Sequence, residues 1–180
     1  LYGMSAGERK ARTEELLAFA GLTERRNDRA RNFSGGMRRK LMIAKTLMHN
    51  PEILLLDEPT VGLDAAWRRR IWDLLRSLNE QGMTIFLTTH YLEEAQILCR
   101  RVGLIDQGKL RKTGEPERII AEAGNFVLEY FKNGETLQEF FETQDDAVLA
   151  AQNIRGAFKV RETNLEDAFI QLTNKRLGEA

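Results

Sequence analysis

Residues 32–64 read NFSGGMRRKLMIAKTLMHNPEILLLDEPTVGLD, and they decide the fold because they join a predicted helix start to a strand that ends in two carboxylates. The apolar run 53–56 is too short to span a membrane. It is bounded by Pro51 and Pro59, as expected for a strand buried on both faces of a parallel sheet. The run stops at Asp57 and Glu58, where open α/β sheets bind their ligands.

Asp57 and Glu58 are candidates for metal and water chemistry. Adjacent strand residues point to opposite faces, so the two carboxylates can have different roles. Asp57 could hold Mg²⁺ through water while Glu58 orients or deprotonates an attacking water. Alternatively, either residue only begins a turn before Pro59, and an isolated Asp-Glu-Pro favours that interpretation. The neighbouring motifs favour the chemical one.

A helix is predicted to begin after Ser34, which is a good N-cap. Gly35 and Gly36 leave backbone N–H groups open to close approach by an anion such as phosphate. The apolar residues of this helix share one face: Met37, Leu41, Ala44 and Met48. A serine-capped helix is common, so this feature alone does not identify a phosphate site.

A second helix is predicted after Asp64, followed by a strand over residues 83–87 and the sequence Thr88-Thr89-His90. The apolar stripe of that helix is Trp67, Ile71, Leu74 and Leu78. A strand–helix–strand order indicates a right-handed parallel crossover, which places His90 at the same sheet edge as Glu58. Histidines at strand ends are more often turn residues, but this placement favours a hydrogen bond to a phosphate or to the attacking water. His49 has no His/Cys cluster around it in the sequence, so a zinc site is not credible.

Four motifs in order resemble those of ATP-binding cassette (ABC) ATPases: 33–37, 53–58, 62–64 and 88–90. The resemblance implies a P-loop NTPase core that binds ATP and Mg²⁺ and hydrolyses ATP. It implies that Ser34, Gly35 and Gly36 contact the γ-phosphate of ATP held by a partner subunit. It also assigns Mg²⁺ to Asp57 and water activation to Glu58.

The resemblance assigns two further residues. His90 is expected to sense the γ-phosphate, and the turn ending at Asp64 is expected to cross the dimer interface. Spacing alone leaves two readings of Asp64 equal, a helix cap only or a cap plus an interface residue, and the resemblance favours the second. Phe33 and Met37 replace the family's usual leucine and glutamine, so the resemblance carries no side-chain role over to Met37, whereas the backbone contacts of Gly35 and Gly36 are still expected.

Two family elements do not occur in these 180 residues: the G-x-x-x-x-G-K-[ST] phosphate loop and the glutamine-bearing loop before the signature helix. The chain begins at Leu1. We therefore expect it to be the C-terminal portion of a longer ATPase, inactive by itself.

Charge and composition exclude several classes. Lys+Arg and Asp+Glu both count 27, which gives no electrostatic reason to expect a nucleic-acid partner. The single cysteine, Cys99, excludes an intrachain disulfide and fits a reducing cytosol. No apolar run approaches the roughly 20 residues of a membrane helix, so we expect no direct membrane insertion.

The expected fold class is α/β, with three parts. Residues 1–50 are part of a helical subdomain with the signature helix, 51–123 are the C-terminal part of the ATPase core, and 124–180 form a small ββαβα domain with a hairpin at Asn133-Gly134. The last part resembles, more weakly, the C-terminal extension of bacterial drug- and polysaccharide-export ATPases, especially over residues 164–169. Packing or dimer stabilisation is its expected role.

The resemblance implies an ATP-hydrolysing subunit of an ABC transporter, in particular a bacterial exporter. Its expected partners are a transmembrane permease, contacted somewhere between Leu1 and Asn32, and a second ATPase subunit in a homodimer or heterodimer. Its expected location is the cytoplasmic face of the cell membrane. Two alternatives stay open: a non-catalytic interaction or dimerisation module, and a soluble ABC ATPase in translation or DNA maintenance.

Overall fold

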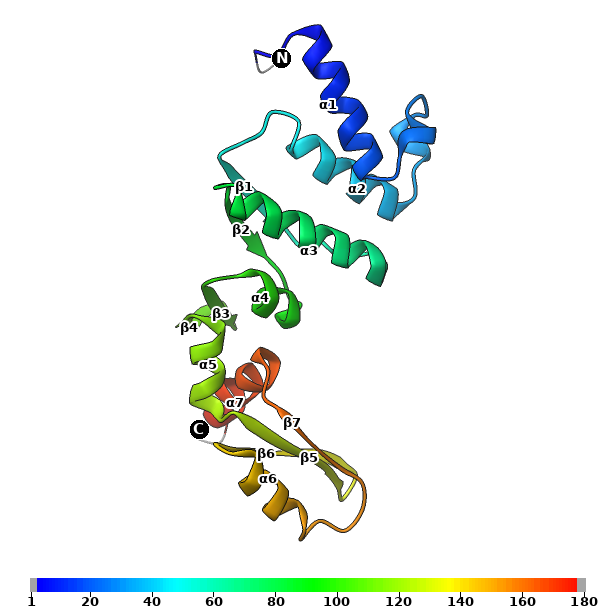
Figure 1. Ribbon diagram of the computed structural model, residues 1–180. Coiled ribbons are helices and arrows are strands. Elements are labelled where there is room, and N and C mark those ends of the chain that lie inside the picture. Colours follow the sequence, from blue (N-terminus) through cyan, green and yellow to red (C-terminus); the bar gives the residue numbers. More distant parts are fainter. Residues whose placement is uncertain (1–2, 178–180) are drawn as a thin grey trace. The chain divides into compact units, whose positions relative to one another are not determined.

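The computed structural model describes residues 3–177, and the chain divides into two compact units, 1–90 and 91–180. Figure 1 shows the elements of both. The part boundaries expected after residues 50 and 123 stay predictions. No helix within residues 3–177 combines the length and apolar character that crossing a membrane requires.

The first unit contains α-helices, two short 3₁₀ turns and two strands. Its main elements are α1 (Ala6–Phe19), α2 (Gly35–Thr46), β1 (Ile53–Asp57), α3 (Ala65–Glu80) and β2 (Thr84–Thr88). Helix α1 begins at a reciprocal capping box between Ser5 and Glu8, and this cap satisfies two backbone N–H groups at the helix start. Helix α2 is shorter than its predicted stripe, because it ends at Thr46 and Met48 lies beyond it.

Strands β1 and β2 pair in parallel, with Ile53 opposite Thr84 and Asp57 opposite Thr88. Helix α3 connects them and lies alongside them (Figure 1). Parallel pairing around an intervening helix is what the sequence predicted. The pairing brings the carboxyl ends of both strands to one edge.

The expectation that β1 is buried on both faces is wrong within this unit. Leu54 and Leu56 are buried, but Ile53 and Leu55 are 63% and 71% exposed, and Phe86 of β2 is 64% exposed. Strand residues alternate between faces, so the exposed residues mark one uncovered face of the pair. An apolar run does not show by itself how many faces of a strand are covered.

Helix α3 buries Ile71, Trp72, Leu75 and Leu78. The prediction is confirmed for Ile71 and Leu78. It is wrong for Trp67 and Leu74, because Trp72 and Leu75 are the buried residues instead. Trp67 is half-buried and packs at the start of the helix, with Lys40 3.6 Å above its ring and Phe19 in a T-shaped contact. These contacts draw Trp67 toward α1 and α2.

The second unit begins with α4 and two antiparallel strands and continues into a three-stranded sheet. Its elements are α4 (Leu92–Leu98), β3 (Val102–Asp106), β4 (Lys109–Gly114), α5 (Pro116–Ala123), β5 (Phe126–Lys132), β6 (Glu135–Phe141), α6 (Gln144–Ala151), β7 (Phe158–Glu162) and α7 (Leu165–Leu177). The order after residue 124 is the ββαβα order predicted from the sequence. The antiparallel sheet has the order β6-β5-β7.

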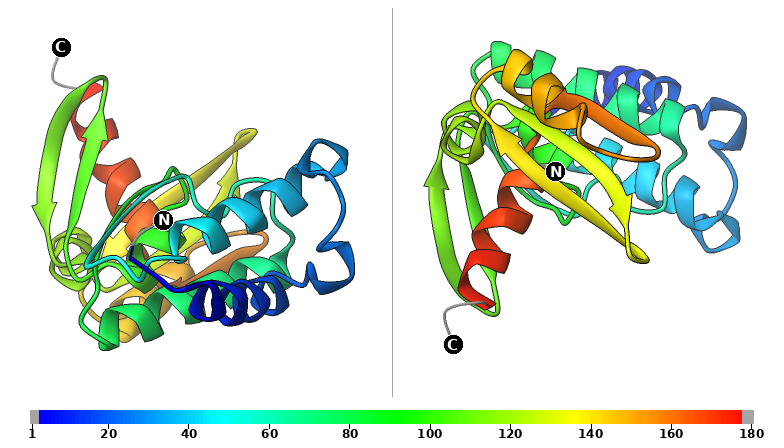
Figure 2. Two further views of the ribbon diagram at one scale, coloured as in Figure 1. Left: turned by 90° about the horizontal axis from the view of Figure 1, so that it is seen from above. Right: turned by 90° about the horizontal axis from the view of Figure 1, so that it is seen from below.

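The hairpin predicted at Asn133-Gly134 is present, and a second hairpin joins β3 to β4. Asn133 and Gly134 have φ angles of 55° and 90°, the left-handed backbone that a tight two-residue hairpin turn requires. Figure 2 shows this β5–β6 hairpin in yellow and the β3–β4 hairpin in light green.

The segment 164–169 joins α7 to the rest of this unit. Asn164 and Asp167 cap the helix start reciprocally, each side chain accepting the other's backbone N–H at 2.9 Å. Asp167 is only 2% exposed, and it accepts from Arg161 of β7 at 2.5 and 2.9 Å. Leu165 is fully buried in a core with Leu104 and other residues of this unit. The segment therefore has a structural role, which is to attach α7 to β7 and to the core of this unit.

Candidate functional site

The carboxyl edge of β1 and β2 brings Glu58 and His90 into contact. His90 Nδ1 lies 2.9 Å from Glu58 Oε2, and the His90 backbone N–H donates to the same oxygen at 3.4 Å. The Glu58 and His90 side chains are 33% and 61% exposed, so a ligand can reach both. The contact fixes the Glu58 carboxylate at the open end of the strand pair.

Glu58 has a left-handed backbone, with φ at 49°. Strand β1 ends at Asp57, so the expectation that strand alternation sets the direction of Glu58 is wrong, and a turn sets it instead. The Glu58 N–H donates to the Thr88 carbonyl at 2.9 Å, which continues the hydrogen bonding between the strands by one residue. Non-glycine residues in sparsely populated backbone regions cost about 1–3 kcal/mol and need surrounding contacts to hold them.

Asp57 is oriented by a threonine on the neighbouring strand. Thr88 is its register partner, and the Thr88 hydroxyl donates to Asp57 Oδ1. Thr88 belongs to the 88–90 motif but has no role predicted from the sequence. The position of Thr88 could have indicated this contact, because Thr88 ends β2 directly opposite Asp57, the last residue of β1.

A second residue without a predicted role is Arg39 of α2. Its guanidinium donates to the backbone carbonyls of Asp57 and Glu58 through Nη2 and to that of Pro59 through Nε at 3.3 Å. Nothing local in the sequence signals this contact, because nearly twenty residues separate the partners along the chain.

The start of α2 has the Ser34 cap that the sequence predicted, and of its two glycines Gly35 is the more open. Ser34 accepts the Met37 N–H at 3.2 Å and caps the helix. A Cβ added at Gly35 would meet no atom within 4 Å, whereas one at Gly36 would lie 3.6 Å from the Gly62 carbonyl. Gly35 is therefore open to close approach, and Gly36 packs beside the turn that leads to Asp64.

Asp64 caps α3 by accepting the Trp67 N–H at 3.0 Å. The Asp64 carboxylate also interacts electrostatically with the Lys40 ammonium. Burial lowers the pKa of Lys40 and outweighs the opposite effect of the Asp64 carboxylate. The cap is thus established by geometry, and an interface role for Asp64 is a proposal.

The donor set at this edge fits Mg²⁺ held mainly by water. The described residues contain no group of three or more His, Cys, Asp or Glu side chains that could hold a metal. Mg²⁺ keeps several waters and binds one or two carboxylates together with substrate phosphates. Asp57 could contribute one such carboxylate, oriented by Thr88.

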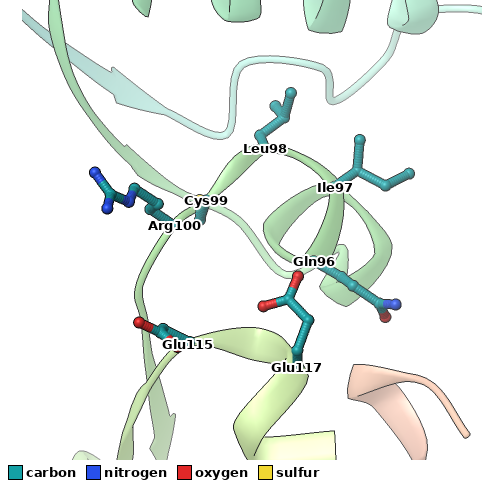
Figure 3. Close-up of a pocket in the computed structure, with 7 residues that line it drawn as sticks. All are labelled: Gln96, Ile97, Leu98, Cys99, Arg100, Glu115 and Glu117. Carbon is teal, nitrogen blue, oxygen red and sulfur yellow. The ribbon is translucent and has the colours of Figure 1, made fainter.

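The second unit has a polar pocket of about 290 Å³ between α4 and the start of α5. Figure 3 shows Glu115 and Glu117 on one side and Gln96 and Cys99 on the other. Burial raises the pKa of the Cys99 thiol, with the Glu94 charge adding to the effect, so the thiol is held protonated. This lining offers no activated nucleophile.

Sequence comparison relates the chain to ATP-binding proteins. The ABC transporter family profile matches residues 3–61. The linearmycin resistance ATP-binding protein LnrL of Bacillus subtilis is 46% identical over 128 residues, which cover 71% of this chain and 41% of that protein. The Nod factor export ATP-binding protein I of Cupriavidus metallidurans is 38% identical over 199 residues, covering 98% of this chain and 65% of that protein. The chain thus spans less than two thirds of either relative.

Structural comparison gives the same family. A dimeric post-hydrolysis state of the ATP-binding cassette MJ0796 bound to ADP and Pi matches with a TM-score of 0.57 and 35% identity, over 63% of this chain and 49% of that one. An ATP-binding subunit of an ABC transporter matches 96% of this chain and 57% of its own, with a TM-score of 0.65 and 24% identity, which supports the α/β fold. Together with the motif residues at one strand edge, these matches show that the chain belongs to the family of ABC transporter ATP-binding subunits.

Proposed function

We propose that the intact protein containing this chain hydrolyses ATP as the motor subunit of an ABC transporter. The observation that carries the proposal is the contact between Glu58 and His90 at the edge where Asp57 also ends its strand. A carboxylate held by a histidine next to a second, separately oriented carboxylate suits water activation beside a metal-bound phosphate.

Glu58 would act as the general base. A water oxygen attacks the γ-phosphorus of ATP, the bond to the β,γ-bridging oxygen breaks, and Glu58 accepts a proton from the water. His90 would orient the Glu58 carboxylate through Nδ1 and contact the γ-phosphate. Asp57 would hold Mg²⁺ through water, and the bound ion would supply charge neutralisation on the phosphates.

Ser34, Gly35 and Gly36 would serve the nucleotide of a second ATPase subunit. The open backbone at Gly35 supports this role, since helix N-termini with accessible N–H groups bind anions. Asp64 would lie at the interface between the two subunits. The similar MJ0796 structure is a dimer with ADP and Pi, which supports a two-subunit assembly here.

The direction of transport is proposed from the names of two relatives. One similar protein is named for Nod factor export and another for linearmycin resistance, which supports an exporter that works with a transmembrane permease at the cytoplasmic face of the membrane. The C-terminal ββαβα segment would stabilise packing or the dimer.

A second candidate function is a non-catalytic interaction module. It is favoured by the lack of a G-x-x-x-x-G-K-[ST] loop within the 180 residues. Mg-ATP binding and phosphate release, measured for the intact protein and for the 180-residue chain, discriminate the two. We expect hydrolysis by the intact protein and only feeble binding by the chain. An intact protein that binds Mg-ATP but releases no phosphate would favour the second function.

A further inference from the structure

We propose that Arg39 is a positioning residue that holds Glu58 in its reactive orientation and connects it mechanically to the Ser34-Gly35-Gly36 helix start. The proposal rests on the function proposed above, because it assigns the support of the catalytic base. It adds a route by which α2 can act on Glu58 within one subunit.

The Arg39 guanidinium donates hydrogen bonds to three successive backbone carbonyls, those of Asp57, Glu58 and Pro59. These carbonyls lie at the end of β1 and in the turn that follows it. Arg39 itself belongs to α2 and is half-buried. These hydrogen bonds therefore connect α2 to the backbone on both sides of Glu58.

Arginine is suited to this task in a way that lysine is not. Its planar guanidinium presents five N–H donors in a rigid fork, whereas the lysine ammonium is a compact charge on a flexible stem. Two different nitrogens of Arg39, Nη2 and Nε, reach the three oxygens. A lysine could approach one or two of the oxygens but could not fix the plane of the peptide groups.

The orientation of Glu58 depends on its backbone. Its φ of 49° is unfavourable for a side-chain-bearing residue and needs contacts to hold it. The Glu58 N–H is held by the Thr88 carbonyl, and the Glu58 carbonyl by Arg39. His90 holds the side chain. Without Arg39 the turn can relax, and the carboxylate would then leave its position beside His90.

Arg39 lies about one helical turn from Gly35, at the start of α2, where the proposed function places a phosphate contact. Gly35 and Arg39 are four residues apart, so they share a face of the helix. A helix moves as a rigid element over this distance. Displacement of the Gly35 end by a nucleotide held on the partner subunit would therefore be carried to the Glu58 turn of the same chain.

The test uses Arg39→Met and Arg39→Lys in the intact ATPase. The matched control is Arg38→Met, because Arg38 is the preceding arginine of α2 and is exposed. We expect Arg39→Met to lower kcat about 10- to 100-fold, the effect of misplacing a reacting group. The KM for ATP should stay as in the wild type. The thermal unfolding midpoint should fall, because the hydrogen bonds from Arg39 to the backbone carbonyls are lost, but the variant should remain folded at the assay temperature. Arg39→Lys should give an intermediate loss, and Arg38→Met should turn over ATP at the wild-type rate.

A double variant separates positioning from independent destabilisation. If Arg39 acts through Glu58, adding Arg39→Met to Glu58→Gln lowers the residual turnover no further, because residues that act as one unit are not additive. A multiplicative further loss would overturn the proposal. If Arg39→Met fails to fold, Arg39→Lys replaces it in both experiments.

The result also distinguishes this inference from the proposed function. Wild-type kcat in both Arg39 variants, with turnover abolished in Glu58→Gln, overturns the role of Arg39 and leaves ATP hydrolysis by Glu58 standing. Unchanged turnover in Glu58→Gln overturns the proposed function itself.

Discussion

His90 Nδ1 lies 2.9 Å from Glu58 Oε2, although 32 positions of sequence separate the two residues. The parallel pairing of β1 and β2 closes that separation, because it brings both strand ends to one edge. The arrangement leaves the carboxylate partly exposed and oriented, which suits the proposed role of Glu58 as general base.

Removing the histidine should slow turnover while ATP still binds. We expect His90→Ala to lower kcat of the intact protein by about 10²-fold, the usual cost of losing one orienting or phosphate-contacting group. His49→Ala is the control, since the exposed His49 lies outside the strand edge. Steady-state phosphate release measures both, and equal rates in the two variants would exclude a role for His90.

Thr88 should tune the response to magnesium. Thr88→Val keeps the size of the side chain and removes the hydroxyl that donates to Asp57. We expect the Mg²⁺ concentration for half-maximal turnover to rise roughly 10-fold, since hydrogen bonds to charged groups are worth about 1.5–3 kcal/mol. Thr84→Val, at the exposed start of the same strand, is the control. A Mg²⁺ titration that superimposes on that of the wild type would contradict the link to Asp57.

Gly35→Ala should separate function from stability. An added Cβ meets no atom within 4 Å, and alanine in a helix is favoured over glycine by up to about 1 kcal/mol. The unfolding midpoint should therefore stay or rise. Turnover should nevertheless fall, because the methyl group would obstruct a phosphate approaching the helix start. Full activity in this variant, measured beside its unfolding curve, would argue against a nucleotide contact at Gly35.

Asp167 should make the stability of the second unit depend on pH. Burial raises its pKa, but hydrogen bonds from Arg161 and the Asn164 backbone outweigh burial, and the net pKa is lowered. A lowered folded-state pKa gives stability that is present above the unfolded pKa of about 4 and is lost as the pH falls through the folded value.

Asp167→Asn should therefore cost about 3 kcal/mol at neutral pH, the loss of one partner of a buried pair, and should flatten the acid dependence. Asp145→Asn is the control, because Asp145 is an exposed acid in the first turn of α6. Hydrogen exchange of residues 126–162 in the intact protein reports both effects. Equal protection in the two variants would refute the structural role of Asp167.

Local patterns carried most of the fold prediction. The Ser34 helix cap, the Asn133-Gly134 turn and the strand–helix–strand order could be predicted because each depends on neighbouring residues or on a chirality rule. The left-handed backbone of Glu58 and the reach of Arg39 could not, because both are set by contacts between segments distant in sequence.

Local sequence patterns also fail to predict which apolar side chains are buried. Ile53 and Leu55 have the apolar character of core residues but lie on an uncovered face, and apolarity alone does not report how many layers cover a strand. Trp67 was placed in the core stripe of α3, whereas Lys40 and Phe19 hold it at the helix end.

The most direct test of the account is single-turnover phosphate release from Mg-ATP by the intact protein carrying Glu58→Gln. The reference is Glu52→Gln, because Glu52 is an exposed glutamate just before β1. Loss of the general base should slow the chemical step by about 10²–10⁴-fold while ATP binding persists. Phosphate release at the rate of the Glu52→Gln variant would show that Glu58 is not the base.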